Sequence, residues 1–265
     1  MEEKDFVSPN DRAVLERSGL ASFEALWDVR LPGVDAPNVG RGGWSEVCRL
    51  ALEGGTYYLK RQSNHLTRSF ARPFGEPTFA REFRNIGRLH ALGIQTLDAA
   101  FFARRRLPGK TGMAQCAVLL TRALDGWQAM DRWATTLSGA ERSSALLAAC
   151  GKIARQLHAS GLIHGCFYPK HVFLREAGEG FEALLIDLEK MRPAWLGRRD
   201  RVRDLDQFFR HAPFLGKNET GTLLAAYLAR APESAEAADW QRRLSTRQAQ
   251  KENAGFFAVR RGKRP

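Results

Sequence analysis

The sequence predicts an α+β protein whose first part is rich in β-sheet and whose second part is mostly helical. Three observations support this prediction. Strand patterns dominate residues 38–122, and one amphipathic helix pattern interrupts them at residues 78–92. Beyond residue 200, helix patterns alternate with loops. Strands and helices that occupy separate parts of a chain are typical of α+β proteins.

Length and composition agree with a globular protein. The chain has 265 residues, of which 44% are hydrophobic and 26% charged, enough for one large domain or two small lobes. No apolar run approaches the roughly 20 residues of a membrane-spanning helix. The N-terminal residues are acidic and polar, unlike a signal peptide, and the four cysteines form no CxxC pair. We therefore expect a soluble, cytoplasmic protein with free thiols.

The net charge is strongly positive, at +12. Such a charge favours an anionic partner, which could be a phosphate-bearing glycan, a nucleic acid or a negatively charged membrane surface. Nucleic-acid binding would rest on charge alone, because the tryptophans lie in apolar patterns typical of a core. We therefore do not expect a nucleic acid as the partner.

The first strands follow a polar segment. Residues 1–37 predict an N-terminal extension with one short helix, at residues 22–29. Two strands then surround a turn at Gly54 and Gly55. The loop that leads into them is rich in glycine, and the glycines concerned are Gly40, Gly42 and Gly43.

The middle of the chain continues the sheet. After the helix at residues 78–92, we expect a strand at 97–103, a basic turn at 104–112 and an apolar strand at 115–121. The segment RALDGW that follows is predicted to connect two lobes. On this basis residues 38–122 form the N-lobe.

Residues 123–250 form the predicted C-lobe. The segment LSGAERSSALLAACGKIARQLHASG is rich in alanine and leucine and predicts a long helix that ends at Gly161. HVFLR and FEALLID predict a hairpin, and the remaining patterns are helical. Residues 251–265 carry a basic cluster, and we expect them to be a disordered tail.

Four features of the chain match the needs of phosphoryl transfer, which requires held phosphates, metal ions and nearby positive charge. The glycine-rich loop would let backbone N–H groups approach phosphates. Lys60, on the following strand, can reach nucleotide phosphates, and Glu82 on the next helix can pair with it. Asp187 follows an apolar strand, a position that suits a carboxylate ligand of Mg²⁺. In this order the features indicate a nucleotide site.

Three segments resemble the lipopolysaccharide kinase (WaaP/Kdo kinase) family, most closely its InaA branch. They are YYLKRQSNHLTRSFARPFGEPTFAREF, HGCFYPKHVFL and LLIDLEKMRPAWLGRRDRVRDLDQF. The resemblance implies a bilobal protein-kinase-like fold that binds ATP and Mg²⁺ between its lobes. It also implies phosphorylation of a sugar of the lipopolysaccharide inner core, an anionic glycan. The charge is compatible with peripheral contact at the inner membrane, where such a substrate is presented.

The resemblance also implies roles for individual residues. Lys60 resembles the phosphate-binding lysine and Glu82 its helix partner. Asp187 resembles the metal-binding aspartate of the DFG motif, and His164 resembles the histidine of the HRD motif. His171 stands where protein kinases have a second metal ligand. Asp204 loosely resembles the aspartate that braces the catalytic loop.

Cys166 is the departure from this pattern, because HRD reads His164-Gly165-Cys166 and the aspartate that accepts the substrate proton is missing. The resemblance implies that HGC is characteristic of the InaA branch. A general base contributes about 10²–10⁴-fold, so a slow enzyme remains compatible with its loss. The sequence thus predicts an ATP-dependent phosphotransferase acting on a lipopolysaccharide-type glycan. The alternative is a pseudokinase, a nucleotide- or glycan-binding regulatory module without turnover.

A third reading uses the same loop differently. The spacing H-x-C-x₄-H could bring His164, Cys166 and His171 together as metal ligands. A fourth ligand with regular spacing is not apparent in the sequence, so a zinc site is less favoured than either the kinase or the pseudokinase.

Overall fold

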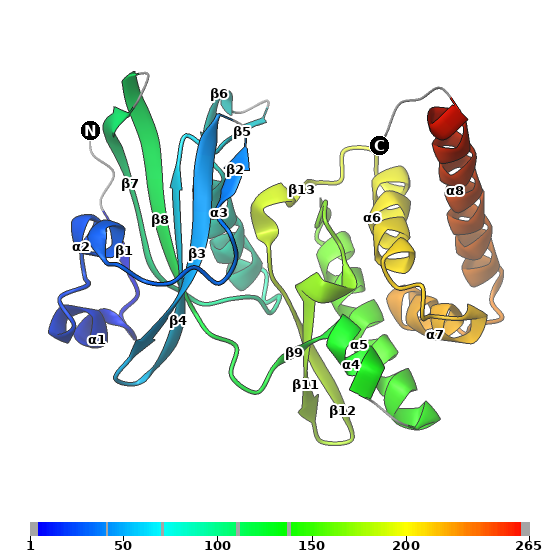
Figure 1. Ribbon diagram of the computed structural model, residues 1–265. Helices are drawn as coiled ribbons and strands as arrows, with labels where there is room; N and C mark the ends of the chain where they lie inside the picture. Colours follow the sequence, from blue (N-terminus) through cyan, green and yellow to red (C-terminus); the bar gives the residue numbers. More distant parts are fainter. Residues whose placement is uncertain (1–4, 41, 70–71, 110–111, 137–138, 261–265) are drawn as a thin grey trace. The chain divides into compact units, whose positions relative to one another are not determined.

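The computed structural model describes residues 5–40, 42–69, 72–109, 112–136 and 139–260. The chain divides into two compact units, Met1–Asp125 and Gly126–Pro265 (Figure 1). The division falls inside RALDGW, the segment that the sequence predicts as a connector.

The first unit is built on an antiparallel sheet with the strand order β1-β7-β8-β4-β3-β2. Its strands are β1 (Phe6–Val7), β2 (Asn38–Gly40), β3 (Gly43–Leu52), β4 (Gly55–Ser63), β7 (Ala99–Gly109) and β8 (Gly112–Arg122). A separate hairpin pairs β5 (Leu66–Ser69) with β6 (Arg72–Pro77). Helices α1 (Arg12–Arg17), α2 (Phe23–Asp28) and α3 (Thr78–Ala91) complete the unit.

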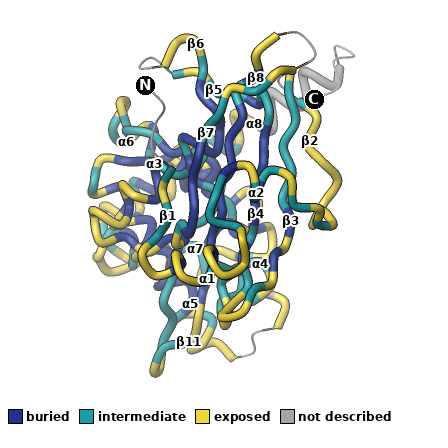
Figure 2. Tube along the Cα trace, turned by 90° about the vertical axis from the view of Figure 1, so that its left-hand side faces the viewer, coloured by how far each residue is buried: buried dark blue, intermediate teal, exposed yellow. Residues whose placement is uncertain are grey.

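The two faces of β4 have different environments, because side chains alternate along a strand. Tyr57 and Leu59 are buried in a core that also contains Leu15 of α1 and Phe23 of α2. Lys60 points to the other face and meets α3. The central strand β8 is buried over most of its length, whereas β4 and β7 are buried only in part (Figure 2). The sheet therefore separates an apolar core from the lysine that the sequence assigns to a nucleotide site.

The basic turn expected at residues 104–112 is wrong, because β7 continues to Gly109. Arg105 belongs to this strand, and its guanidinium donates hydrogen bonds to both carboxylate oxygens of Asp5, at 2.7 and 2.8 Å. It also bonds Glu24 at 3.3 Å and lies over the ring of Phe23. The N-terminal segment thus pairs with Arg105 of this strand and packs as part of the first unit.

The second unit is mostly helical. Its helices are α4 (Met130–Thr136), α5 (Ala140–Ala159), α6 (Arg198–Arg210), α7 (Lys217–Leu228) and α8 (Ala235–Arg260). The predicted hairpin is present as β11 (Val172–Ala177) and β12 (Gly180–Leu185), extended by β9 (Gln128–Ala129). A second small pairing joins β10 (Leu162–Ile163) and β13 (Arg192–Pro193). The mixed α+β architecture confirms the predicted fold class.

Helix α8 is longer than the sequence suggests. It continues through residues 251–260, which we expected to belong to a disordered tail. This stretch contains Lys, Glu and Ala, residues with good helix propensity, so the helix that starts at Ala235 can extend into it. Residues 261–265 lie outside the described part of the chain.

Two global expectations can be compared with the structure. The four cysteines are buried free thiols, as predicted. Within the described ranges, no helix combines the length and apolar character needed to cross a bilayer.

Close packing of α5 on α7 depends on Gly151. A Cβ added at this position would lie 2.4 Å from the backbone oxygen of Leu223, so we expect Gly151→Ala to force the helices apart. The free energy of unfolding should fall by about 1–3 kcal/mol, as in other overpacked cores. Gly87 in α3 is a matched control, because its Cβ would meet nothing within 4 Å. Gly87→Ala should stabilise by about 0.5–1 kcal/mol, and chemical denaturation compares the two. Equal effects would contradict this account of the helix contact.

Candidate functional site

In the first unit, the structure pairs Lys60 with Glu82. Lys60 Nζ lies 2.7 Å from Glu82 Oε1, and the glutamate side chain is only 2% exposed. The lysine comes from β4, at the centre of the sheet, and the glutamate from the buried side of α3. The pairing is the one that the sequence predicts, and it fixes the lysine against the sheet.

The glycine-rich loop is a tight turn between β2 and β3, in which Gly40 pairs with Gly43. Gly42 has a φ of +76°, which favours glycine. A Cβ on Gly43 would lie 2.1 Å from the backbone oxygen of Ser63, at the end of β4. The glycines therefore bring the turn close to the strand that carries Lys60. Arg41 lies outside the described residues.

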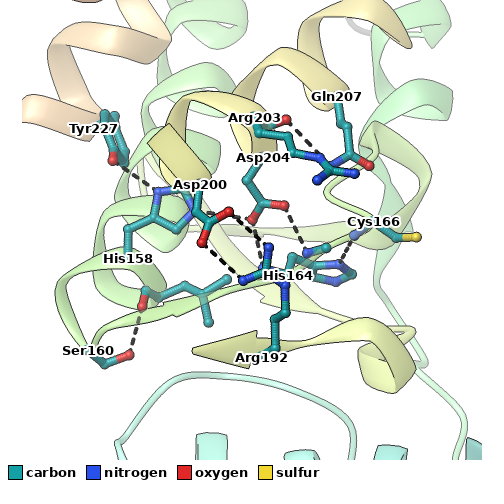
Figure 3. Close-up of polar contacts among 12 residues, drawn as sticks. His158, Ser160, His164, Cys166, Arg192, Asp200, Arg203, Asp204, Gln207 and Tyr227 are labelled. Carbon is teal, nitrogen blue, oxygen red and sulfur yellow. Dashed lines mark hydrogen bonds and ion pairs between the residues drawn. The ribbon is translucent and has the colours of Figure 1, made fainter. Parts of the chain in front are cut away.

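In the second unit, Asp204 of α6 organises the loop that contains HGC (Figure 3). Its Oδ2 accepts the backbone N–H of His164 at 2.7 Å, and its Oδ1 accepts that of Gly165 at 2.8 Å. Asp204 is fully buried. The loose match from the sequence thus corresponds to a direct brace between α6 and the loop.

The ring of His164 is engaged on both sides. Its Nε2 lies 2.9 Å from the backbone oxygen of Ile186, which identifies Nε2 as the protonated nitrogen. Its Nδ1 accepts the backbone N–H of Cys166 at 3.3 Å. Burial lowers the pKa of His164 despite the opposing charges of Asp204 and Asp187. The neutral ring therefore ties the loop to the segment after β12.

The side chains of His171 and Asp187 lie together. His171 Nδ1 bonds the backbone oxygen of Cys166 at 2.9 Å, so this nitrogen carries the proton. The other nitrogen, Nε2, lies 3.2 Å from Asp187 Oδ2. Burial lowers the pKa of His171, against the opposing effect of the Asp187 charge. Two acceptor atoms thus face each other, an arrangement that a bound cation satisfies.

The spacing of these two atoms fits Mg²⁺. Adjacent ligands of an octahedral Mg²⁺ at about 2.1 Å lie about 3 Å apart, close to the 3.2 Å observed. Mg²⁺ prefers oxygen, so His171 is the less usual of the two ligands. Asp187 has the left-handed backbone conformation, with φ and ψ both 58°, which brings its carboxylate to the histidine immediately after β12.

The structure does not support the zinc reading. Among the described residues, no group of three or more His, Cys, Asp or Glu side chains is arranged to hold a metal ion. Both ring nitrogens of His164 and Nδ1 of His171 are already engaged with the backbone.

Gly165 and Lys190 link the HGC and DLEK segments. Gly165 has a φ of +79°, and a Cβ there would lie 2.6 Å from the backbone oxygen of Lys190. Cys166 is buried beside the same lysine. Burial alone lowers the pKa of Lys190, but its hydrogen bond to Cys166 and the nearby negative charges reverse this and raise it. Both departures from HRD therefore lie against Lys190 of DLEK, Gly165 against its backbone and Cys166 against its side chain.

Several residues of this network were missed from the sequence. His158 of α5 bonds Asp204 Oδ2 at 3.2 Å and the hydroxyl of Tyr227 at 3.0 Å (Figure 3). Arg192 forms a two-pronged ion pair with Asp200, at 2.9 and 3.0 Å. Hydrogen bonds from Arg192 lower the pKa of Asp200 despite its burial. In the sequence, the only indication of this network was the segment RRDRVRDLD, in which Asp200 and Asp204 are four residues apart and therefore lie on one face of a helix.

The predicted site residues therefore form two groups, one in each unit. The first contains the glycine turn with Lys60 and Glu82, and the second contains the HGC loop with His171 and Asp187.

Comparisons with known proteins agree on one family. The model of the lipopolysaccharide kinase (Kdo/WaaP) family matches residues 24–245. Protein InaA of Escherichia coli (strain K12) is 29% identical over 200 residues, which cover 72% of this chain and 89% of that protein. The solved structure of WaaP in complex with acyl carrier protein is similar with a TM-score of 0.65 and 19% identity. That match covers 92% of this chain and 99% of WaaP. The expected kinase-like fold is confirmed.

We predict that Gly165 is required by its contact with Lys190 as well as by its backbone angle. Gly161 is the control, because its φ is +76° and a Cβ there would meet nothing within 4 Å. Gly161→Ala should cost about 1–2 kcal/mol of unfolding free energy through the left-handed conformation alone. Gly165→Ala should cost about 1–3 kcal/mol more, because the Lys190 carbonyl must move. Urea denaturation measures both losses, and equal losses would show that the contact is unimportant.

Proposed function

Because this chain belongs to the lipopolysaccharide kinase (Kdo/WaaP) family, we propose that it is an ATP-dependent phosphotransferase. It transfers the γ-phosphate of ATP to a sugar hydroxyl of a lipopolysaccharide-type glycan. Its charge of +12 suits an acceptor that already carries phosphate groups.

The ion pair of Lys60 and Glu82 is the observation that carries this proposal. A buried ion pair contributes little net stability, because removing both charges from water offsets their attraction. An apolar pair would serve the sheet and α3 equally well. The pair instead keeps an ammonium group oriented on a central strand, 16% exposed, where it can bind phosphate oxygens. We assign Lys60 to the phosphates of ATP and Glu82 to the orientation of Lys60.

The remaining assignments follow from the chemistry of the donors. The backbone of Gly40, Gly42 and Gly43 can approach phosphates closely. Asp187 and His171 would hold Mg²⁺, which neutralises charge on phosphate oxygens when bound. We assign His164 to positioning of the loop, because both of its ring nitrogens bond the backbone.

Loss of the HRD aspartate lowers the expected rate and leaves the binding residues intact. In a loose phosphoryl-transfer transition state, positioning and electrostatic stabilisation supply most of the acceleration. A missing base removes about 10²–10⁴-fold of it. We therefore propose slow turnover in which Cys166 is not a nucleophile.

A pseudokinase is the alternative, and Cys166 is the observation that favours it. The residue is 5% exposed and provides a thiol where a carboxylate would accept a proton. Such a protein would bind nucleotide or glycan and regulate a partner without turnover.

Nucleotide binding and transfer test the proposal together. In Asp187→Asn, which keeps the side-chain shape and tolerates a left-handed backbone, Mg²⁺-dependent thermal stabilisation by ATP should be lost. Lys60→Met should reduce transfer of labelled γ-phosphate to lipopolysaccharide by about 10²-fold or more, because a charge on the phosphates is removed. Asp35→Ala and Lys152→Met, both at exposed positions, are matched controls.

The outcomes separate the two candidates. Transfer that depends on Lys60 and Asp187 supports the kinase. Mg²⁺-dependent binding without transfer, under conditions where the controls bind equally, supports the pseudokinase. Absence of nucleotide binding at millimolar ATP contradicts both nucleotide readings.

We also propose peripheral contact with an anionic membrane through the β5–β6 hairpin. Phe74 on β6 is 90% exposed, and two exposed arginines lie on the same hairpin, Arg72 on β6 and Arg68 on β5. Met113, near the start of β8, is 53% exposed, and the start of β8 lies at the same end of the first unit as β6 (Figure 1). An exposed aromatic residue among arginines suits an interface with acidic lipids.

Phe74→Ser should weaken binding to vesicles that contain acidic phospholipid by about tenfold, because burial of one aromatic side chain contributes roughly 1.5–3 kcal/mol. Leu92→Ser, at an exposed apolar position after α3, should leave binding unchanged. Vesicle co-sedimentation measures both. If wild-type protein stays in the supernatant with acidic vesicles, the membrane proposal fails.

A further inference from the structure

A small cavity in the second unit has no role in the proposed reaction. It measures about 220 Å³ and lies among α5, α6, α7 and α8. None of its lining residues belongs to the glycine turn, the HGC loop or the Mg²⁺ site. The residues that matter for its chemistry are Arg155, His158, Arg198, Arg201, Glu236 and Trp240.

The cavity is rich in positive charge. Neither the Arg155 nor the Arg201 guanidinium has a hydrogen bond or ion pair among the residues that the structure describes. Arg198 forms an ion pair with Asp239, in which Nη1 and Oδ2 are 3.2 Å apart. The single acidic residue in the lining, Glu236, pairs with Arg230 at 3.7 Å. An excess of positive charge therefore faces the cavity.

Two hydrogen-bond donors of the lining residues have no acceptor. They are Nε of Arg201 and Nε1 of Trp240, which are among the few buried side-chain polar atoms without a partner in the described chain. Trp240 is 4% exposed, so its N–H group has little access to bulk solvent. A buried donor without an acceptor lowers stability, so an acceptor bound in the cavity would stabilise the protein at these two groups.

We propose that this cavity binds a phosphate-type oxyanion, either inorganic phosphate or the phosphate group of a small ester. A tetrahedral oxyanion offers several acceptor oxygens to donors that converge from different helices. Guanidinium groups bind phosphate through paired N–H donors. A carboxylate has fewer oxygens and would leave more of these donors without an acceptor.

The cavity shares His158 with the brace of the HGC loop. One ring nitrogen of His158 bonds Asp204, and the other bonds Tyr227, which also lines the cavity (Figure 3). Asp204 in turn holds the backbone of His164 and Gly165. The anion thus binds next to the residues that fix the loop, at a site separate from the proposed nucleotide site.

An NMR titration of the indole N–H groups tests the proposal directly. Full-length protein labelled with ¹⁵N-tryptophan is titrated with inorganic phosphate and with glucose 6-phosphate, against chloride at equal ionic strength. Nucleotide and Mg²⁺ are absent, so the result does not depend on the proposed kinase activity. The Trp240 resonance, identified by its loss in Trp240→Phe, should shift and saturate at millimolar anion or below.

Variants distinguish this cavity from general attraction to a basic protein. Arg201→Gln and the exposed Arg155→Gln should each weaken binding by about tenfold, because each removes a charge-assisted contact. Arg199→Gln, on the same helix but outside the lining, should bind as wild type does. Arg155→Gln keeps the test valid if Arg201→Gln does not fold.

Tighter binding of glucose 6-phosphate identifies an ester as the ligand class, and tighter binding of inorganic phosphate identifies the free anion. The proposal is overturned if the Trp240 resonance does not move at millimolar phosphate. It is equally overturned if all three arginine variants bind alike.

Discussion

The buried carboxylate of Asp204 is the interaction on which the second unit's chemistry depends. A carboxylate without water or partners would be strongly unfavourable in the interior. Here two backbone N–H groups and a histidine nitrogen satisfy it. Those N–H groups belong to a loop that has no regular partner strand and would otherwise lack acceptors. The carboxylate and the loop therefore stabilise each other, and α6 sets the position of HGC.

The two departures from HRD have different physical origins. Gly165 is imposed by packing, because its positive φ and the nearby Lys190 carbonyl leave no room for an arginine side chain. The HGC and DLEK segments therefore pack directly against each other. Cys166 is held by other contacts, because its backbone groups bond His164 and His171 and its buried side chain bonds Lys190. Its presence in place of the aspartate changes the group that is available to accept a proton.

The sequence predicted what depends on local pattern. It placed Lys60 on a strand and Glu82 on the next helix, and it predicted that the two could pair, as the structure shows. Prediction from the sequence failed where a contact with a distant segment of the chain determines the local structure. Arg104–Gly109 read as a turn because the partner of Arg105, Asp5, is 100 residues away. His158 carried no signal, because its partners come from α6 and α7.

The polar pairs that are present in this chain say more about its function than the missing HRD aspartate does. Lys60 with Glu82, and His171 with Asp187, are buried or half-buried polar pairs, and such pairs give a fold little that apolar side chains would not. A scaffold that needed only its shape would have no use for either pair. Both pairs have the chemistry to bind phosphate and metal. The kinase and pseudokinase proposals thus assign the same residues to nucleotide binding, and the difference between them reduces to the proton acceptor at Cys166.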